Sequence, residues 1–193
     1  MIRIFTLLCC LAACSGGGGQ VSGPPVPSET GFVALQDSVA QMGVSYMAAL
    51  PTTGVADYRG MARLALPLGS APALYHGDLR LSVDFGGGAA PMTGTIGGLQ
   101  GPGAAVYGAL QISGGRIYPD AHAARDYQFG ADLTGNLTQA GQTHALSAEI
   151  SGDFHGPGGT AVSGVIHRGK IGQADAVDMF HGAFAARQVA SGG

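Results

Sequence analysis

The stretch QTHALSAEISGDFHGPGGTAVSGVI, residues 142–166, decides the fold class. Its apolar residues alternate with polar ones, so that Leu146, Ile150 and Phe154 fall on one face of an extended chain. A period of two is typical of a half-buried antiparallel strand. The residues GPGG at 156–159 then reverse the chain, because proline fixes φ and glycine accepts positive φ. The apolar row resumes after this turn, and the stretch therefore predicts a β-hairpin.

The same alternation recurs along most of the chain. It is strong over residues 56–66 and 76–88. Weaker runs lie at residues 91–97, 105–113, 127–137, 161–168 and 177–187. About eight strands result, and eight is the number at which a closed sheet can fill its own interior with side chains. We therefore predict an all-β fold: a single soluble eight-stranded antiparallel up-and-down β-barrel over residues 56–188.

The alternation also predicts which side chains face the interior of this barrel. The residues expected inside are Leu81, Val83, Phe85, Ile150 and Phe154. The residues expected to face water are Arg59, Arg63, Arg80, Asp84, Glu149 and Asp153. An inverted barrel in the outer membrane is the alternative, but such barrels carry aromatic girdles, and this chain has no Trp and only 7% aromatic residues.

Composition narrows the class of protein further. Glycine accounts for 35 of 193 residues without a collagen-like period, which indicates many turns and bulges. Charged residues make up only 11% of the chain, and the net charge is −3. Since no basic stripe is present, nucleic acid is not expected as a partner.

The N-terminus has the pattern of a targeting segment. Arg3 is followed by an apolar run of about ten residues, the length of a signal-peptide core and too short for a membrane span. The run ends Leu-Ala-Ala-Cys at residues 11–14, which resembles the bacterial lipobox. This predicts a lipoprotein signal peptide over residues 1–13 and a lipidated Cys14, which anchors the chain to the membrane; a plain signal peptide with an incidental cysteine is the alternative.

The remaining segments surround the barrel. Residues 14–31 are rich in glycine and proline and are predicted to be a flexible tether that begins at the lipidated cysteine. Residues 32–55 are predicted to pack against the barrel as a short helix or an irregular segment, and residues 189–193 to form a disordered tail. All cysteines precede residue 15, so the mature chain has neither a disulfide nor a thiol nucleophile.

Several residues of the hairpin stretch match a known family. Gly152, Phe154, Gly156, Pro157 and Gly164 resemble the signature of the transferrin-binding protein B-like β-barrel, a barrel that also occurs in factor H-binding protein. The sequence departs from that signature with histidine at position 155, threonine and alanine at 160–161, and serine at 163. The resemblance extends loosely over residues 56–187. It implies a surface lipoprotein that binds a protein or haem, with a role in iron or haem acquisition.

Candidate site residues come from residues 114–126, the long irregular stretch between two of the predicted strands. It is the densest charged and polar cluster in a chain that is otherwise poor in charge. Loops on a rigid scaffold often carry recognition, and Tyr and Arg are enriched at binding hot spots. We therefore expect Arg116, Tyr118, His122 and Arg125 to bind the ligand, unless the stretch is only a solvated connector.

No catalytic or metal-binding pattern is present in the sequence. The six histidines have no spacing typical of a zinc site, and no nucleophile motif is found. The chain is therefore expected to be a non-enzymatic binding module without a cofactor, held in the bacterial outer membrane and facing the surface or the periplasm. A structural or assembly-assisting envelope lipoprotein without a small-molecule ligand is the alternative.

Overall fold

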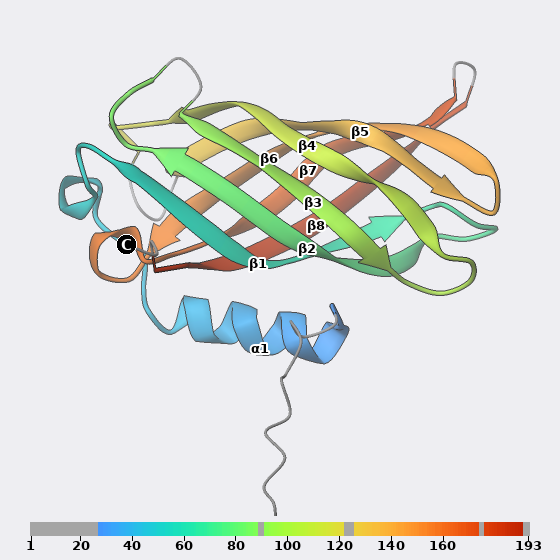
Figure 1. The fold of residues 1–193 in the computed structure, drawn as a ribbon, viewed down its shortest axis with the longest axis horizontal. Coiled ribbons are helices and arrows are strands. Elements are labelled where there is room, and N and C mark those ends of the chain that lie inside the picture. The colour runs from blue at the N-terminus through green and yellow to red at the C-terminus, as the bar shows by residue number, and fades with distance from the viewer. Residues whose placement is uncertain (1–26, 89–90, 122–125, 174–175, 191–193) are drawn as a thin grey trace, which may run out of the picture.

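The computed structural model describes residues 27–88, 91–121, 126–173 and 176–190. Eight antiparallel strands form a closed barrel in sequence order, with β8 pairing back to β1 (Figure 1). The strands are β1 (Val55–Leu66), β2 (Ala73–Asp84), β3 (Met92–Gln100), β4 (Val106–Ile117), β5 (Phe129–Gln139), β6 (Gln142–His155), β7 (Ala161–Gln173) and β8 (Ala176–Gln188). The predicted fold class is confirmed.

The predicted end of the fourth strand is wrong. The stretch 114–126 was expected to be irregular, but β4 continues to Ile117. A register shift between Ser113 and Arg116 shows that the strand bulges instead of ending. Gly114 adopts a φ of 64° at this point, a conformation that glycine accepts at no steric cost. The two glycines at 114–115 therefore form a β-bulge, although consecutive glycines are also typical of the end of a strand.

The apolar rows face the interior, as predicted. Leu81, Val83, Ile150 and Phe154 are buried in one continuous core. Phe85 is only partly buried, because it follows the last residue of β2 at the end of the barrel. The structure therefore does not have the inverted arrangement.

The polar rows lie on the outer face of the barrel, as predicted, but one of their residues is not open to water. Arg59 and Arg80 are exposed, and the carboxylate residues Asp84, Glu149 and Asp153 are half-buried. Arg63 was expected to face water, but its side chain is only 31% exposed. It lies beneath a helix that packs on the outside of the barrel, as described below.

Glycines in the middle of the inward rows explain much of the glycine content. A Cβ on Gly60 would lie 2.0 Å from the backbone oxygen of Ala185 on the neighbouring strand, so no side chain fits there. Such close approach is typical of glycine at the bends of a barrel wall. Further glycines of the strands would also place a Cβ within 2.5 Å of a backbone oxygen on an adjacent strand, among them Gly94, Gly135, Gly152, Gly164, Gly169 and Gly182.

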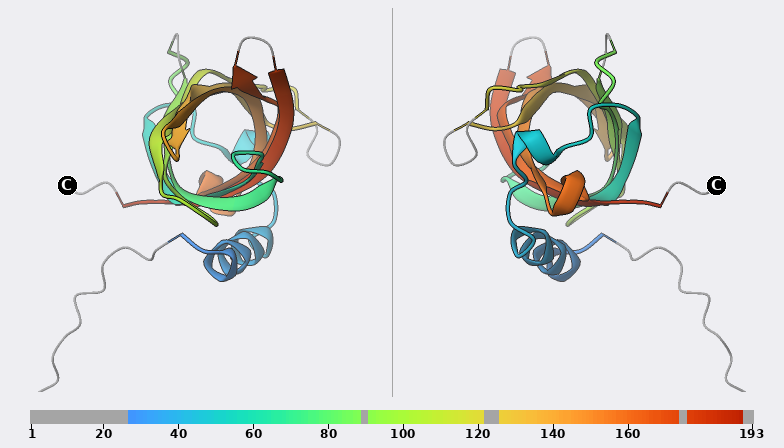
Figure 2. Two further views of the ribbon diagram at one scale, coloured as in Figure 1. Left: turned by 90° about the vertical axis from the view of Figure 1, so that its right-hand side faces the viewer. Right: turned by 90° about the vertical axis from the view of Figure 1, so that its left-hand side faces the viewer.

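A helix, α1 (Glu29–Ala40), lies along the outer face of the barrel (Figures 1 and 2). It packs against β1, β7 and β8. Val39 is fully buried against Ala161 and Ala185, whose small side chains let the helix approach the sheet. The helix begins inside the stretch predicted to be tether, because the Ser28 side chain accepts a hydrogen bond from the Gly31 amide and caps it.

The first turn of α1 is fixed to the barrel by charge. The Glu29 carboxylate lies 2.7 Å from Nη1 of Arg63 on β1 and 2.8 Å from Nε2 of His76 on β2. The buried ring of Phe32 lies 4.8 Å from the Arg63 guanidinium carbon. The His76 hydrogen bond and the Arg63 charge lower the pKa of Glu29. These contacts explain why Arg63 does not face open water.

Two short 3₁₀ helices complete the described chain, η1 (Met47–Ala49) and η2 (Pro157–Gly159). Of the helices within the described residues, none has both the length and the apolar composition needed to span a bilayer.

Candidate binding site

The two ends of the barrel are built differently. One end, here called the loop end, gathers the described segments 43–54, 85–88, 118–121, 126–128 and 156–160. Both 3₁₀ helices lie at this end, close to the barrel opening (Figure 2, right). The other end, here called the hairpin end, has the shorter connections, among them residues 67–72 and 101–105. The longer segments, and with them the candidate site, are therefore at the loop end.

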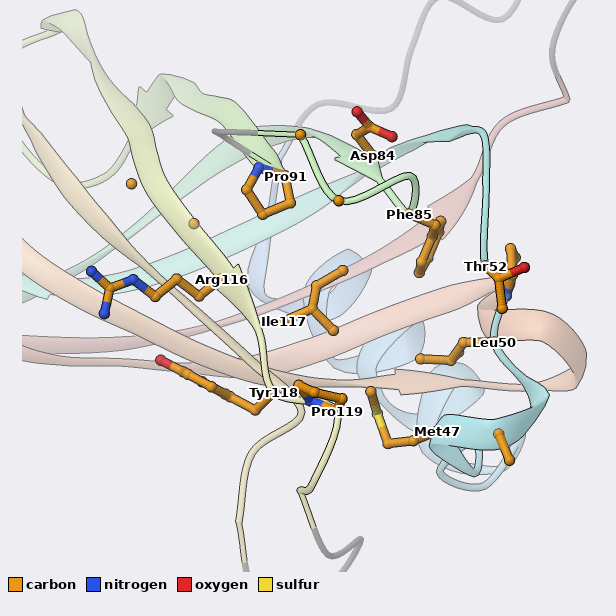
Figure 3. Close-up of a pocket in the computed structure, with 16 residues that line it drawn as sticks. Met47, Leu50, Thr52, Asp84, Phe85, Pro91, Arg116, Ile117, Tyr118 and Pro119 are labelled. Carbon is orange, nitrogen blue, oxygen red and sulfur yellow. The ribbon is translucent and has the colours of Figure 1, made fainter.

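A pocket of about 750 Å³ opens at the loop end. Met47 and Leu50 come from the segment before β1, Phe85 from the β2–β3 connection and Ile117 from the end of β4 (Figure 3). The other lining residues are Ala48, Pro51, Thr52, Asp84, Gly87, Gly88, Pro91, Gly114, Gly115, Arg116, Tyr118 and Pro119. The lining is mostly apolar and small.

Local hydrogen bonds set the shape of the β2–β3 wall. Asp84 Oδ1 accepts a hydrogen bond from the Gly86 amide at 2.8 Å, and Gly87 follows with a φ of 77°. The Phe85 amide donates to the Gly54 carbonyl at 2.9 Å. The Phe85 ring centroid lies 5.4 Å from that of Phe154 in the core. The pocket is thus continuous with the hydrophobic core through Phe85.

A buried polar network holds the other segments of the loop end in place. The fully buried Gln128 donates from Nε2 to the Ser45 carbonyl at 2.6 Å and accepts the Phe154 amide at Oε1 at 2.8 Å. The Ser45 hydroxyl donates to the Gly156 carbonyl. Buried groups that are all paired rigidify a structure. The segment that carries Met47 and Leu50 is therefore fixed to β6 and to the β4–β5 connection.

Tyr58 adds a contact from inside the barrel. Its hydroxyl donates to the Gly159 carbonyl at 2.7 Å, which connects β1 to η2. Burial raises the pKa of Tyr58 well above its usual range. The hydroxyl is therefore protonated and can donate this hydrogen bond at neutral pH.

The predicted site residues have mixed positions. Arg116 and Tyr118 line the pocket, but Figure 3 shows their side chains directed away from Met47, Leu50 and Phe85. They lie over the outer face of β5 and β6, beside Asp132 and Ser151. His122 and Arg125 lie outside the described residues, as does Cys14. The predicted ligand-binding roles therefore remain predictions.

The apolar lining residues could not be recognised from the sequence as a site. Met47, Leu50, Phe85 and Ile117 have the composition of ordinary core residues, and they come from three separate segments. Only the closure of the barrel brings these segments together. One sequence signal could have indicated them. These apolar residues lie beside glycine- and proline-rich connections, where a solvent-exposed turn normally has polar residues.

Two histidines beside the β6–β7 hairpin form hydrogen bonds with nearby serines. His155 Nε2 lies 2.8 Å from the Ser163 hydroxyl, and His167 Nε2 lies 2.9 Å from the Ser151 hydroxyl. Burial lowers the pKa of His155, which the nearby Asp153 partly opposes. Within the described ranges, no group of three or more His, Cys, Asp or Glu residues is arranged to hold a metal ion.

The described lining of the pocket has few polar side chains. Its ionisable side chains are Asp84, Arg116 and Tyr118, and Thr52 adds a hydroxyl group.

Comparisons with known proteins give similarity to solved structures but none to curated sequences or family models. No protein-family model and no curated protein matches the chain. Among solved structures, the chain is similar to a tryptophan-to-alanine mutant of the vaccine antigen transferrin binding protein B from Haemophilus parasuis Hp5, with 17% sequence identity and a TM-score of 0.39. The match covers 75% of this chain and 28% of that chain. The resemblance to transferrin-binding protein B that residues 150–166 indicated is confirmed as a resemblance, and the barrel fold itself follows from the strand pairing.

Proposed function

We propose that this chain is a lipoprotein anchored in the bacterial outer membrane, and that its single barrel binds a ligand or a protein at the loop end. The observation that carries the proposal is the apolar pocket of about 750 Å³ on a scaffold fixed by Gln128 and Ser45. Small-molecule sites are typically concave, mostly apolar and preformed, and mouths of barrels are a common place for them.

The position of α1 supports this choice of end. The helix starts near the hairpin end, where Glu29 contacts Arg63 and His76 close to the β1–β2 connection. It runs towards the loop end, where the Ser45 amide donates to the Phe154 carbonyl (Figure 1). A tether from a lipidated Cys14 to Glu29 would span at most about 50 Å. In this proposal the hairpin end is nearer the membrane and the loop end faces away from it.

Exposed tyrosines favour a protein as one kind of partner. Tyr46, Tyr118 and Tyr127 are 78%, 44% and 43% exposed, and all three lie in loop-end segments. Tyrosine combines an apolar ring with a hydroxyl group and is enriched at binding hot spots. A partner that covers the loop end would bury all three rings.

Iron or haem acquisition is the more specific form of this proposal. The Met47 side chain points into the pocket, and a methionine thioether is a known haem-iron ligand. A titration with haemin tests it: a Soret shift that saturates at one haemin per chain and is lost in Met47→Leu would support it. A Soret spectrum equal to that of free haemin would exclude the haem form and leave binding of other ligands or proteins.

The anchor is tested separately. We expect Cys14→Ser to remove the chain from the membrane fraction, because no other residue of the mature sequence carries a thiol. A mutant that still fractionates with the outer membrane at unchanged mature mass would contradict the anchor. If the anchor is confirmed but neither haemin nor any surface partner binds, the structural or assembly-assisting envelope lipoprotein becomes the better description.

A further inference from the structure

We infer that the loop-end pocket binds a small apolar molecule without a formal charge, such as a medium-chain alcohol or a neutral aromatic compound. This inference rests on the proposed function in placing binding at the loop end. It goes further because it names the chemical class of the ligand. That class is inferred from the charges and the shape of the residues that line the pocket.

The side chains that point into the pocket are apolar. Met47, Leu50, Phe85 and Ile117 converge in Figure 3 on the space between them. The charged group of Arg116 points away from these four side chains, and the Asp84 carboxylate accepts the Gly86 amide within its own turn. Burying a charge without a paired partner is costly. A charged ligand group would therefore stay at the rim, and the buried part of a ligand should be neutral.

The pocket stays open because its lining cannot easily collapse. Small residues make up much of the wall, among them Gly88, Gly114 and Ala48. The segment behind Met47 is held by the Gln128 and Ser45 hydrogen bonds. A volume of about 750 Å³ lies within the usual range for small-molecule sites. An apolar cavity of fixed shape binds apolar guests, because water finds few polar partners in it.

The test uses the neutral fluorescent probe N-phenyl-1-naphthylamine on the mature chain with Cys14→Ser, free of lipid and detergent. Two matched pairs of variants separate the pocket from the surface around it. Ala48 and Thr52 line the pocket, whereas their neighbours Ala49 and Thr53 do not, and all four are exposed. Tryptophan at 48 or 52 adds a ring inside the pocket, and tryptophan at 49 or 53 adds the same ring outside it.

We expect saturable binding of one probe per chain, weakened at least tenfold by Ala48→Trp and Thr52→Trp and changed less than twofold by Ala49→Trp and Thr53→Trp. Dodecanol should displace the probe better than dodecanoate or dodecylamine. The inference is overturned if the unaltered pocket does not bind the probe, if both members of each pair act alike, or if a charged competitor is stronger than dodecanol. Melting curves identify any variant that does not fold, and the other pair then decides. This test uses neither haemin nor the lipid anchor. A negative result would therefore exclude a neutral apolar ligand without deciding whether the chain binds haem or is anchored to the membrane.

Discussion

Replacing Phe154 by alanine removes the side chain that connects the barrel core to the loop-end pocket. Phe154 is fully buried, and its ring centroid lies 5.0 Å from that of Phe129 and 5.4 Å from that of Phe85. Truncating a buried phenylalanine costs about 3–5 kcal/mol, and each aromatic contact contributes about 0.5–1.5 kcal/mol of this. For a chain of this size, such a loss lowers the melting temperature by about 6–20 °C.

Urea unfolding followed by circular dichroism measures this loss, since the chain has no tryptophan to report on it. The slope of the transition should stay unchanged while the midpoint falls. Tyr46→Ala is the matched control: it also removes an aromatic ring at the loop end, but from a side chain that is 78% exposed, and it should change stability by less than about 0.5 kcal/mol. Equal midpoints for Phe154→Ala and the unaltered chain would refute the inward position of this row.

Two further predictions concern the wall of the barrel and the outer helix. Gly60→Ala should destabilise the protein by about 1–3 kcal/mol, because its Cβ would meet the backbone of β8, whereas Gly69→Ala, with no atom within 4 Å, should be neutral; urea midpoints compare the two. Glu29→Gln should lower stability at pH 7 by no more than about 1 kcal/mol. The lowered pKa of Glu29 means that its contribution is present above pH 4.5 and is lost as the pH falls below this value. Unfolding midpoints of the two proteins should therefore approach each other as the pH falls below 4.5, and a difference that does not change with pH would contradict the Glu29 contacts.

The barrel could be predicted from the sequence because its strands are buried on one face only. The alternation of Leu146, Ile150 and Phe154 with polar residues is a local property, and no partner strand is needed to detect it. The end of β4 was predicted wrongly for a related reason. The glycines at 114–115 bend the strand, and only the pairing of Arg116 with Gly130 shows that it continues.

The helix contacts and the pocket could not be predicted, because both depend on residues far apart in the chain. Arg63 has the alternation of a solvated residue, and only the position of α1 brings Glu29 to it. Phe85 and Ile117 have the alternation of core residues, yet they end at the mouth of the barrel because their strands end there. The alternation of apolar and polar residues predicts whether a side chain points into the barrel or out of it. Whether an inward side chain is buried in the core or exposed at the mouth depends on where the neighbouring strands end.

The central claim is that this barrel binds its ligand at the loop end. Amide chemical-shift mapping of the mature Cys14→Ser chain during titration with N-phenyl-1-naphthylamine tests it most directly. We expect the largest shifts in the segments 47–52, 84–88 and 114–119, which carry the lining residues of the pocket. Shifts concentrated instead at the hairpin end, in residues 67–72 and 101–105, or spread evenly over the outer face of the barrel, would contradict it.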